Sequence, residues 1–170
     1  CPPQPSTSLA PTILSTGQSP PLTRMSGRQA RISSIGVSSS KQVTRLSAVN
    51  DALLAGTALG TYESVTYAGA NGAPIQMWVN YPPGFDKSKK YPVFLLIHGG
   101  PHGAFSDHFH PRWNGQAFSA AGYVVAMVNY HGSSGFGHAF RDSIMGRMGE
   151  LELIDIEAGT DWLLRQSWVD

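Results

Sequence analysis

The feature that most constrains this chain is the apolar run VFLLI at residues 93–97, which passes directly into the tetrapeptide HGGP at residues 98–101. Five residues are far too few to cross a bilayer. A short apolar run bounded by glycines is typical of a strand buried on both faces of a parallel sheet. A second run, YVVAMVNY at residues 123–130, has the same character. We therefore expect two strands in the core of one α/β domain.

Two segments with helical spacing complete this pattern. Residues 111–121 are expected to form a helix that stops at Gly122. Residues 150–166 are expected to form an amphipathic helix with acidic residues in its first turn. The apolar positions are Trp113, Ala117, Phe118 and Ala121 in the first helix and Leu151, Ile154, Ala158, Trp162 and Leu163 in the second. The order strand, helix, strand, helix predicts a parallel α/β sheet.

The chain before residue 93 has a different character. Residues 62–67 and 75–81 alternate as strands do, and they flank a turn-rich link that contains Asn71-Gly72. Residues 30–47 show short alternation around a Ser-rich turn, which predicts a hairpin. Half of the 12 prolines lie in the first 21 residues among Ser, Thr and Gln, a composition typical of an extended or disordered segment.

Composition narrows the possible partners. The net charge of +1 creates no field that would favour nucleic acid or a membrane surface, so neither is expected as a partner. Five basic residues precede Asp51, but they are scattered without interleaved aromatics and are weak evidence for a nucleic-acid arm. The single cysteine, Cys1, excludes an internal disulfide and leaves the compartment open. Because the chain begins with Cys1 and not Met, we expect its natural N-terminus to be missing.

The HGGP tetrapeptide is the main candidate site. It follows a buried strand, and ligands of parallel sheets gather at the carboxyl ends of strands. The amide N–H groups of Gly99 and Gly100 are sterically open, so they could donate to the oxyanion that forms when an acyl carbon becomes tetrahedral. In α/β-hydrolases, the loop after the third strand supplies such a donor. The alternative is a tight turn without a chemical role.

Histidines are concentrated near this tetrapeptide, within a window of 41 residues. A zinc site is one interpretation, because neutral imidazoles are good ligands. No Cys accompanies them and their spacing matches no zinc motif, so we predict no metal and no cofactor. Loop histidines that make local hydrogen bonds are the more ordinary interpretation. The six are His98, His102, His108, His110, His131 and His138.

The glycine-rich segment NYHGSSGFG at residues 129–137 is not a nucleophile elbow. The G-x-S-x-G motif needs a glycine two residues before and two residues after the serine. Ser134 has Gly132 before it but Phe136 after it, and Ser133 is preceded by His131. No G-x-S-x-G occurs anywhere in these 170 residues. We interpret the segment as a loop beside the site or as a simple turn.

Three stretches together resemble one family: YPVFLLIHGGPHG, RWNGQAFSAAGYVVAMVNYHGSSGFGHAF and GRMGELELIDIEAGTDWLL. They resemble the prolyl oligopeptidase family of serine peptidases, and within it the acylaminoacyl-peptidase and dipeptidyl-peptidase branch. The resemblance covers about residues 42–170. It implies a β-propeller followed by an α/β-hydrolase domain. On this basis, residues 1–60 are a Pro/Ser-rich segment with the end of a propeller, and residues 61–170 are the N-terminal half of an α/β-hydrolase sheet.

The resemblance also implies roles for particular residues. Gly99 and Gly100 are similar to the oxyanion-loop positions, and His98 and Pro101 would shape that loop. Glu150, Glu152 and Asp155 match an acidic pattern typical of the family, and we interpret the role of this pattern as structural.

The triad Ser, Asp and His would lie beyond Asp170. We therefore expect a fragment of a peptidase that acts on short peptides and is inactive alone, because removing even one triad member costs many orders of magnitude. The strand at residues 92–97 would then be an exposed hydrophobic edge and an aggregation site. An esterase or lipase fragment, a non-catalytic interaction module and a metal-binding loop protein are the alternatives.

Overall fold

The computed structural model describes residues 35–37, 43–45, 48, 50–108 and 110–170. Strands β1 (Ile35–Val37) and β2 (Val43–Arg45) pair antiparallel, which confirms the expected hairpin in the residues described. A single-turn helix α1 (Asp51–Leu54) follows. The Pro/Ser-rich segment before residue 35 lies outside the described residues, and the domain boundary at residue 60 stays a prediction.

The main sheet has four strands in the order β3-β4-β6-β5. Strands β3 (Thr61–Ala68) and β4 (Pro74–Tyr81) form an antiparallel hairpin, with the 3-10 turn η2 (Ala70–Gly72) between them. Strand β6 (Val124–Asn129) pairs antiparallel with β4 and parallel with β5 (Val93–Leu96). Asn71 and Gly72 both have positive φ, 56° and 74°, which explains why Asn-Gly occupies this turn.

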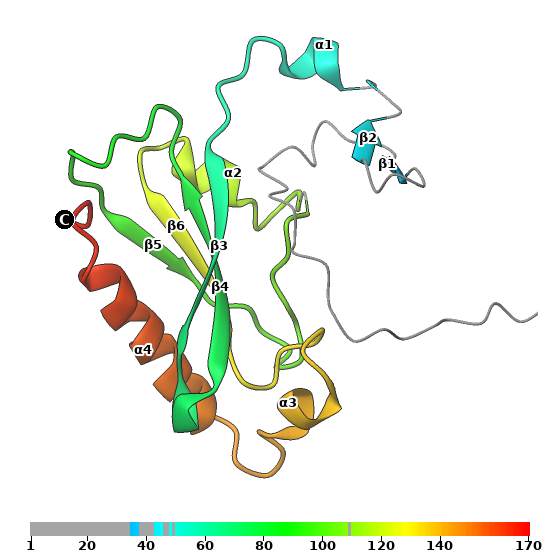
Figure 1. The fold of residues 1–170 in the computed structure, drawn as a ribbon, viewed down its shortest axis with the longest axis vertical. Coiled ribbons are helices and arrows are strands. Elements are labelled where there is room, and N and C mark those ends of the chain that lie inside the picture. The colour runs from blue at the N-terminus through cyan, green and yellow to red at the C-terminus, as the bar shows by residue number, and fades with distance from the viewer. Residues whose placement is uncertain (1–34, 38–42, 46–47, 49, 109) are drawn as a thin grey trace, which may run out of the picture.

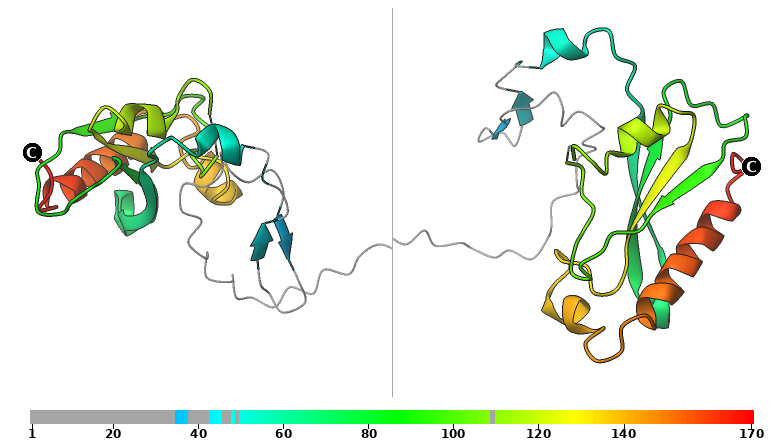
Figure 2. Two further views of the ribbon diagram at one scale, coloured as in Figure 1. Left: turned by 90° about the horizontal axis from the view of Figure 1, so that it is seen from above. Right: turned by 180° about the vertical axis from the view of Figure 1, so that it is seen from behind.

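One helix covers each face of the sheet (Figure 1; Figure 2, right). Helix α4 (Leu151–Leu164) packs with the larger core, which includes Ile75, Val79 and Val128. Helix α2 (Gly115–Ser119) lies over a smaller cluster around Leu96, Val125 and Met127. A further short helix, α3 (His138–Asp142), lies in the connection between β6 and α4. Among the helices of the described ranges, none has the length and apolar character needed to cross a membrane.

The parallel pairing expected from the order strand, helix, strand, helix is confirmed for β5 and β6, because the segment that contains α2 crosses over between them. The described sheet as a whole is mixed. The hairpin β3–β4 and the direct pairing of β4 with β6 are antiparallel.

The strand at residues 93–97 is not buried on both faces. Phe94 is 38% exposed and Ile97 is 55% exposed, whereas every residue of β6 is buried. The reason is position: β5 is the outermost strand in the described part of the sheet, and β6 is central. Just before β5, an isolated parallel bridge joins Tyr91 to Val169. It places Val169 at this edge of the sheet.

The helix over residues 111–121 buries a different face from the one expected. It begins at Gly115, and Ala117 is exposed while Gly115 and Ser119 are buried. Apolar spacing could not locate this face, because the side of α2 that faces the sheet carries small residues.

The expected face of α4 is largely confirmed. Leu151 and Leu163 are buried, and Ala158 and Trp162 pack against the larger core. The exception is Ile154, which is 47% exposed while the adjacent Asp155 is fully buried.

Candidate oxyanion loop and its supports

The HGGP loop leaves the carboxyl end of β5. Gly99 and Gly100 are both exposed, and within the described residues neither amide N–H donates to a protein acceptor. Gly100 has φ +129°, and a Cβ there would lie 2.9 Å from the Gly103 nitrogen. This position therefore requires glycine. A Cβ on Gly99 would meet nothing within 4 Å. The Gly100–Pro101 peptide bond is cis.

His98 connects this loop to the end of β6. Its ring stacks on Tyr130 with centroids 4.3 Å apart. Its Nε2 atom lies 2.8 Å from the Ser133 hydroxyl, and its Nδ1 atom lies 3.2 Å from the Gly99 carbonyl oxygen. The Tyr130 hydroxyl donates to the His98 carbonyl oxygen. Burial lowers the pKa of His98 below its ordinary 6.5, against a smaller opposing effect of the Gly99 hydrogen bond.

The glycine-rich loop after β6 is bonded to the HGGP loop at several points. The Ser134 amide donates to the Gly103 carbonyl at 3.1 Å, and its hydroxyl donates to the His102 carbonyl at 2.6 Å. His102 Nδ1 in turn donates to the Gly132 carbonyl at 2.8 Å. These reciprocal bonds hold the two loops together as one unit at the carboxyl ends of the parallel strands, which is where parallel sheets bind their ligands.

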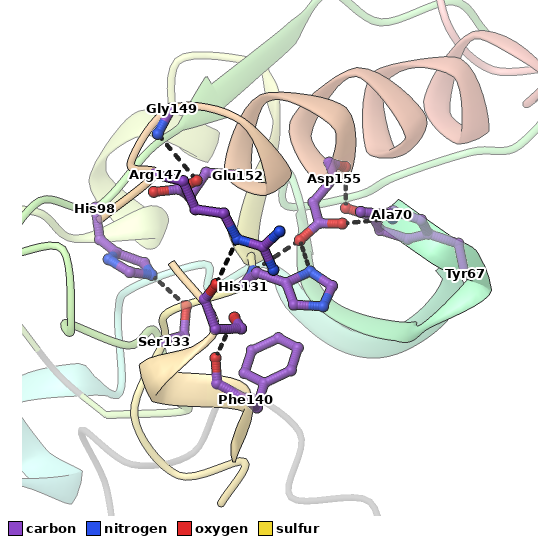
Figure 3. A network of polar contacts seen from close by, with 11 residues as sticks. Tyr67, Ala70, His98, His131, Ser133, Phe140, Arg147, Gly149, Glu152 and Asp155 are labelled. Carbon is purple, nitrogen blue, oxygen red and sulfur yellow. Dashed lines mark hydrogen bonds and ion pairs between the residues drawn. The ribbon is translucent and has the colours of Figure 1, made fainter. Parts of the chain in front are cut away.

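The buried carboxylate of Asp155 in α4 is bonded to the loop after β6 and supports this unit (Figure 3). Its Oδ2 atom accepts from the His131 amide at 2.7 Å and from His131 Nδ1 at 2.6 Å. Its Oδ1 atom accepts from the Ala70 amide at 2.8 Å, and its carbonyl accepts from the Tyr67 hydroxyl at 2.7 Å. One residue therefore joins the β3–β4 turn, the loop after β6 and α4, as expected of a structural acid.

The neighbouring acids differ in their role. Glu152 is buried and its Oε2 atom accepts from the Gly149 amide at 3.1 Å at the start of α4. Glu150 is exposed just before the helix, and no side-chain contact of this residue is found in the described part of the chain.

A cleft of about 190 Å³ opens beside His98. Its apolar wall comes from Phe105, Trp113 and Met127, among others. Next to it, burial raises the pKa of Asp107 to about 6, and its Oδ2 atom has no hydrogen-bond partner among the described residues. Burial and then the Asp107 charge raise the pKa of Tyr62 to about 12. The wall is thus apolar, with a carboxyl group and a phenol of raised pKa beside it.

The remaining histidines make local contacts. His110 Nδ1 accepts from the amides of Arg112 and Trp113 at 3.1 and 2.9 Å. His108 Nδ1 lies 2.5 Å from the Ser106 hydroxyl. No group of three or more potential metal ligands comes together among the residues the structure describes. Local hydrogen bonding is thus the interpretation that the geometry favours for these side chains.

Sequence reasoning found the HGGP loop but missed three of its supports. Ser133, Tyr130 and His131 had no assigned role, although all three are buried at the site. The only available signal was their position in the chain. The three residues lie at the end of the second apolar run or just after it, and the carboxyl ends of parallel strands meet at the same edge of a sheet.

Taken together, the mixed sheet with helices on both faces and a glycine loop at the end of β5 define an α/β-hydrolase domain. A sequence model described as the prolyl oligopeptidase family matches residues 108–170. Dipeptidyl-peptidase 5 of Schizosaccharomyces pombe is 43% identical over 103 residues, which cover 61% of this chain and 15% of that protein. Probable dipeptidyl-peptidase 5 of Aspergillus clavatus is 48% identical over 86 residues, 51% of this chain and 12% of that protein.

Solved structures give the same fold. The acylaminoacyl peptidase of Pyrococcus horikoshii superposes with a TM-score of 0.66 at 23% identity, covering 76% of this chain and 21% of that one. Dipeptidyl peptidase 4 of Porphyromonas gingivalis has a TM-score of 0.66 at 22% identity, covering 84% of this chain and 21% of that one. Over these segments the chain is similar to members of the prolyl oligopeptidase family, and it spans 12–15% of the length of the curated relatives described above.

Proposed function

We propose that these residues form the oxyanion side of a serine peptidase that hydrolyses short peptides by acyl-enzyme chemistry. The observation that carries the proposal is the pair of exposed glycine amides, Gly99 and Gly100, that donate to no protein acceptor in the described residues. They lie at the carboxyl end of a strand in a fold whose members use this loop for an oxyanion. Similarity to dipeptidyl peptidases and an acylaminoacyl peptidase supports a peptide substrate.

In this proposal, a serine hydroxyl from outside these 170 residues attacks the carbonyl carbon of the scissile peptide bond. The carbonyl oxygen becomes an oxyanion and accepts a hydrogen bond from a glycine amide. Collapse of the tetrahedral species expels the amine and leaves an acyl-enzyme, which water hydrolyses in a second addition. One preorganised donor of this kind contributes about 10²–10³-fold to the rate. His98 and Pro101 shape the loop and take no part in proton transfer.

The test uses the natural polypeptide that contains these residues, produced from its own reading frame. It is assayed with aminoacyl and dipeptidyl anilides and with a simple acyl ester that carries no amino acid. Release of aniline from the peptidyl substrates is expected. Z-Gly-Gly-Phe-chloromethyl ketone, with which an acylaminoacyl peptidase has been solved in complex, is expected to inactivate the enzyme. Hydrolysis of the acyl ester alone would instead identify an esterase, and no turnover of any substrate would refute the proposal.

A further inference from the structure

Ser133 and His98 form a close pair that the catalytic proposal leaves without a role. The Ser133 hydroxyl oxygen lies 2.8 Å from His98 Nε2. A serine beside a histidine suggests a nucleophile and its base, but Ser133 is 0% exposed and no acyl carbon can reach it. This burial assigns the pair to support of the loop and not to attack on a substrate.

The surroundings of His98 determine where its proton lies. The Tyr130 hydroxyl gives its only hydrogen to the His98 carbonyl oxygen, so towards the ring it can only accept. His98 Nδ1 therefore faces two acceptors, the Tyr130 hydroxyl oxygen at 3.1 Å and the Gly99 carbonyl at 3.2 Å. Two acceptors require a hydrogen on Nδ1. In a neutral ring Nε2 is then an acceptor, and the Ser133 hydroxyl donates to it.

We propose that Ser133 is a positioning residue for the oxyanion loop: its buried hydroxyl holds His98 as the neutral Nδ1–H tautomer, and that N–H holds the Gly99 carbonyl. Fixing this carbonyl orients the peptide plane between Gly99 and Gly100, and hence the Gly100 amide. The catalytic part of this inference rests on the function proposed above. The tautomer and the loop orientation do not.

Ser133 is itself firmly held. Its amide donates to the Tyr130 carbonyl at 3.0 Å, and the preceding Gly132 amide donates to the Phe140 carbonyl at 3.1 Å. One residue earlier, His131 is bound to Asp155 through two hydrogen bonds. Figure 3 shows the bonds of His131 to Asp155 in α4 and the bond of Ser133 to His98. Hydrogen bonds, together with the backbone from His131 to Ser133, thus connect the core of the domain to the Gly99 carbonyl.

A neutral ring is consistent with the groups that surround His98. Phe105 packs edge-on at 5.3 Å and Tyr130 stacks on the other side. The cleft beside the ring is also lined by Tyr62, His108 and His110. No carboxylate contacts the ring in the described residues, and burial disfavours a protonated imidazole more than the Gly99 hydrogen bond favours it.

The test compares Ser133→Ala with Ser143→Ala in the natural polypeptide. Ser143 is a matched control, because its hydroxyl donates to the Phe140 carbonyl at 2.7 Å at the end of α3 and has no hydrogen bond to the HGGP loop in the described residues. For Ser133→Ala we expect kcat for a dipeptidyl anilide to fall about 10- to 100-fold with KM nearly unchanged, since the amide is misplaced and not removed. The acidic limb of kcat/KM should move to higher pH, because the lost hydrogen bond favoured neutral His98. Ser143→Ala should leave kcat and the pH profile unchanged.

A second measurement needs no variant and no activity. Nitrogen-15 spectra of histidine side chains in the unsubstituted protein are expected to show His98 as the Nδ1–H tautomer at pH 7.5. The Nε2–H tautomer, or a Ser133→Ala variant that keeps its fold, its kcat and its pH profile, would overturn the inference. If the protein hydrolyses no peptide, the proposed function fails, and the tautomer still decides the positioning role.

Discussion

The substitution Asp155→Asn tests whether one buried carboxylate holds the site together. The carboxylate is 0% exposed and accepts three N–H bonds, from the Ala70 amide, the His131 amide and His131 Nδ1. An amide side chain keeps one acceptor oxygen. If that oxygen faces His131, the new NH₂ group faces the Ala70 amide, and two donors oppose each other in a buried place.

The expected cost is large compared with the stability of a domain. Each hydrogen bond to a charged group is worth about 1.5–3 kcal/mol, and a buried donor left without its acceptor costs about 1–3 kcal/mol more. We therefore expect Asp155→Asn to lower the free energy of unfolding by about 3–5 kcal/mol, out of the roughly 5–15 kcal/mol typical of domains.

Urea unfolding followed by circular dichroism measures this loss. At a slope of about 2 kcal/mol per molar, the midpoint should fall by about 1.5–2.5 M. Glu157→Gln is the matched control, since Glu157 is an exposed acid on the same helix, and its midpoint should stay within about 0.25 M, the shift of a typical surface substitution. A change below about 1 kcal/mol for Asp155→Asn would refute the argument that this carboxylate holds the β3–β4 turn and the loop after β6.

Three further predictions concern the loop and its surroundings. Gly100→Ala should lower both stability and kcat/KM, because Gly100 has a φ of +129° and an added Cβ would lie too close to Gly103. Gly99→Ala should fold normally, because an added Cβ would meet nothing there. Thermal unfolding and anilide hydrolysis measure the two effects. Burial places the pKa of His98 below 6.5, so as the pH falls the unfolded chain takes up its proton before the folded chain does. The stability that neutral His98 contributes is therefore complete above pH 6.5 and decreases as the pH falls through the folded pKa. Unfolding midpoints should decrease with pH in this way, and the decrease should be lost in His98→Asn. The pKa of Asp107 is raised to about 6, so its charge destabilises the fold above that pH. Asp107→Asn should therefore raise the unfolding midpoint at pH 7 and leave it nearly unchanged at pH 4. Equal shifts of the midpoint at both pH values would contradict this.

Local patterns in the sequence predicted the strands well. The alternation before Asn71-Gly72 and after it corresponds to β3 and β4, and the run at residues 123–130 contains the central strand β6. These signals are strong because the sheet itself determines which residues of each strand are buried. The exposure of Phe94 could not be predicted in the same way, since it depends on β5 being the outermost described strand and not on its composition.

The candidate site was predictable in its centre and not in its supports. Glycines after an apolar run identify a loop with open amides, because that property belongs to the residues themselves. The roles of Ser133 and Asp155 depend on partners 35 and 85 positions away in the chain, His98 and Ala70. Only the fold brings such residues together, and buried acids on a helix look like solvent-facing ones when the sequence is considered alone.

The central claim is that the amides of Gly99 and Gly100 bind the oxyanion of a peptide substrate. The most direct measurement is the structure of the natural polypeptide inactivated by a dipeptidyl phosphonate, whose oxygen occupies the place of the oxyanion. We expect that oxygen about 2.7–3.1 Å from the amide nitrogen of Gly100 or Gly99. A bound phosphonate whose oxygens contact neither amide, or loop amides that donate to protein carbonyls in that structure, would contradict the account.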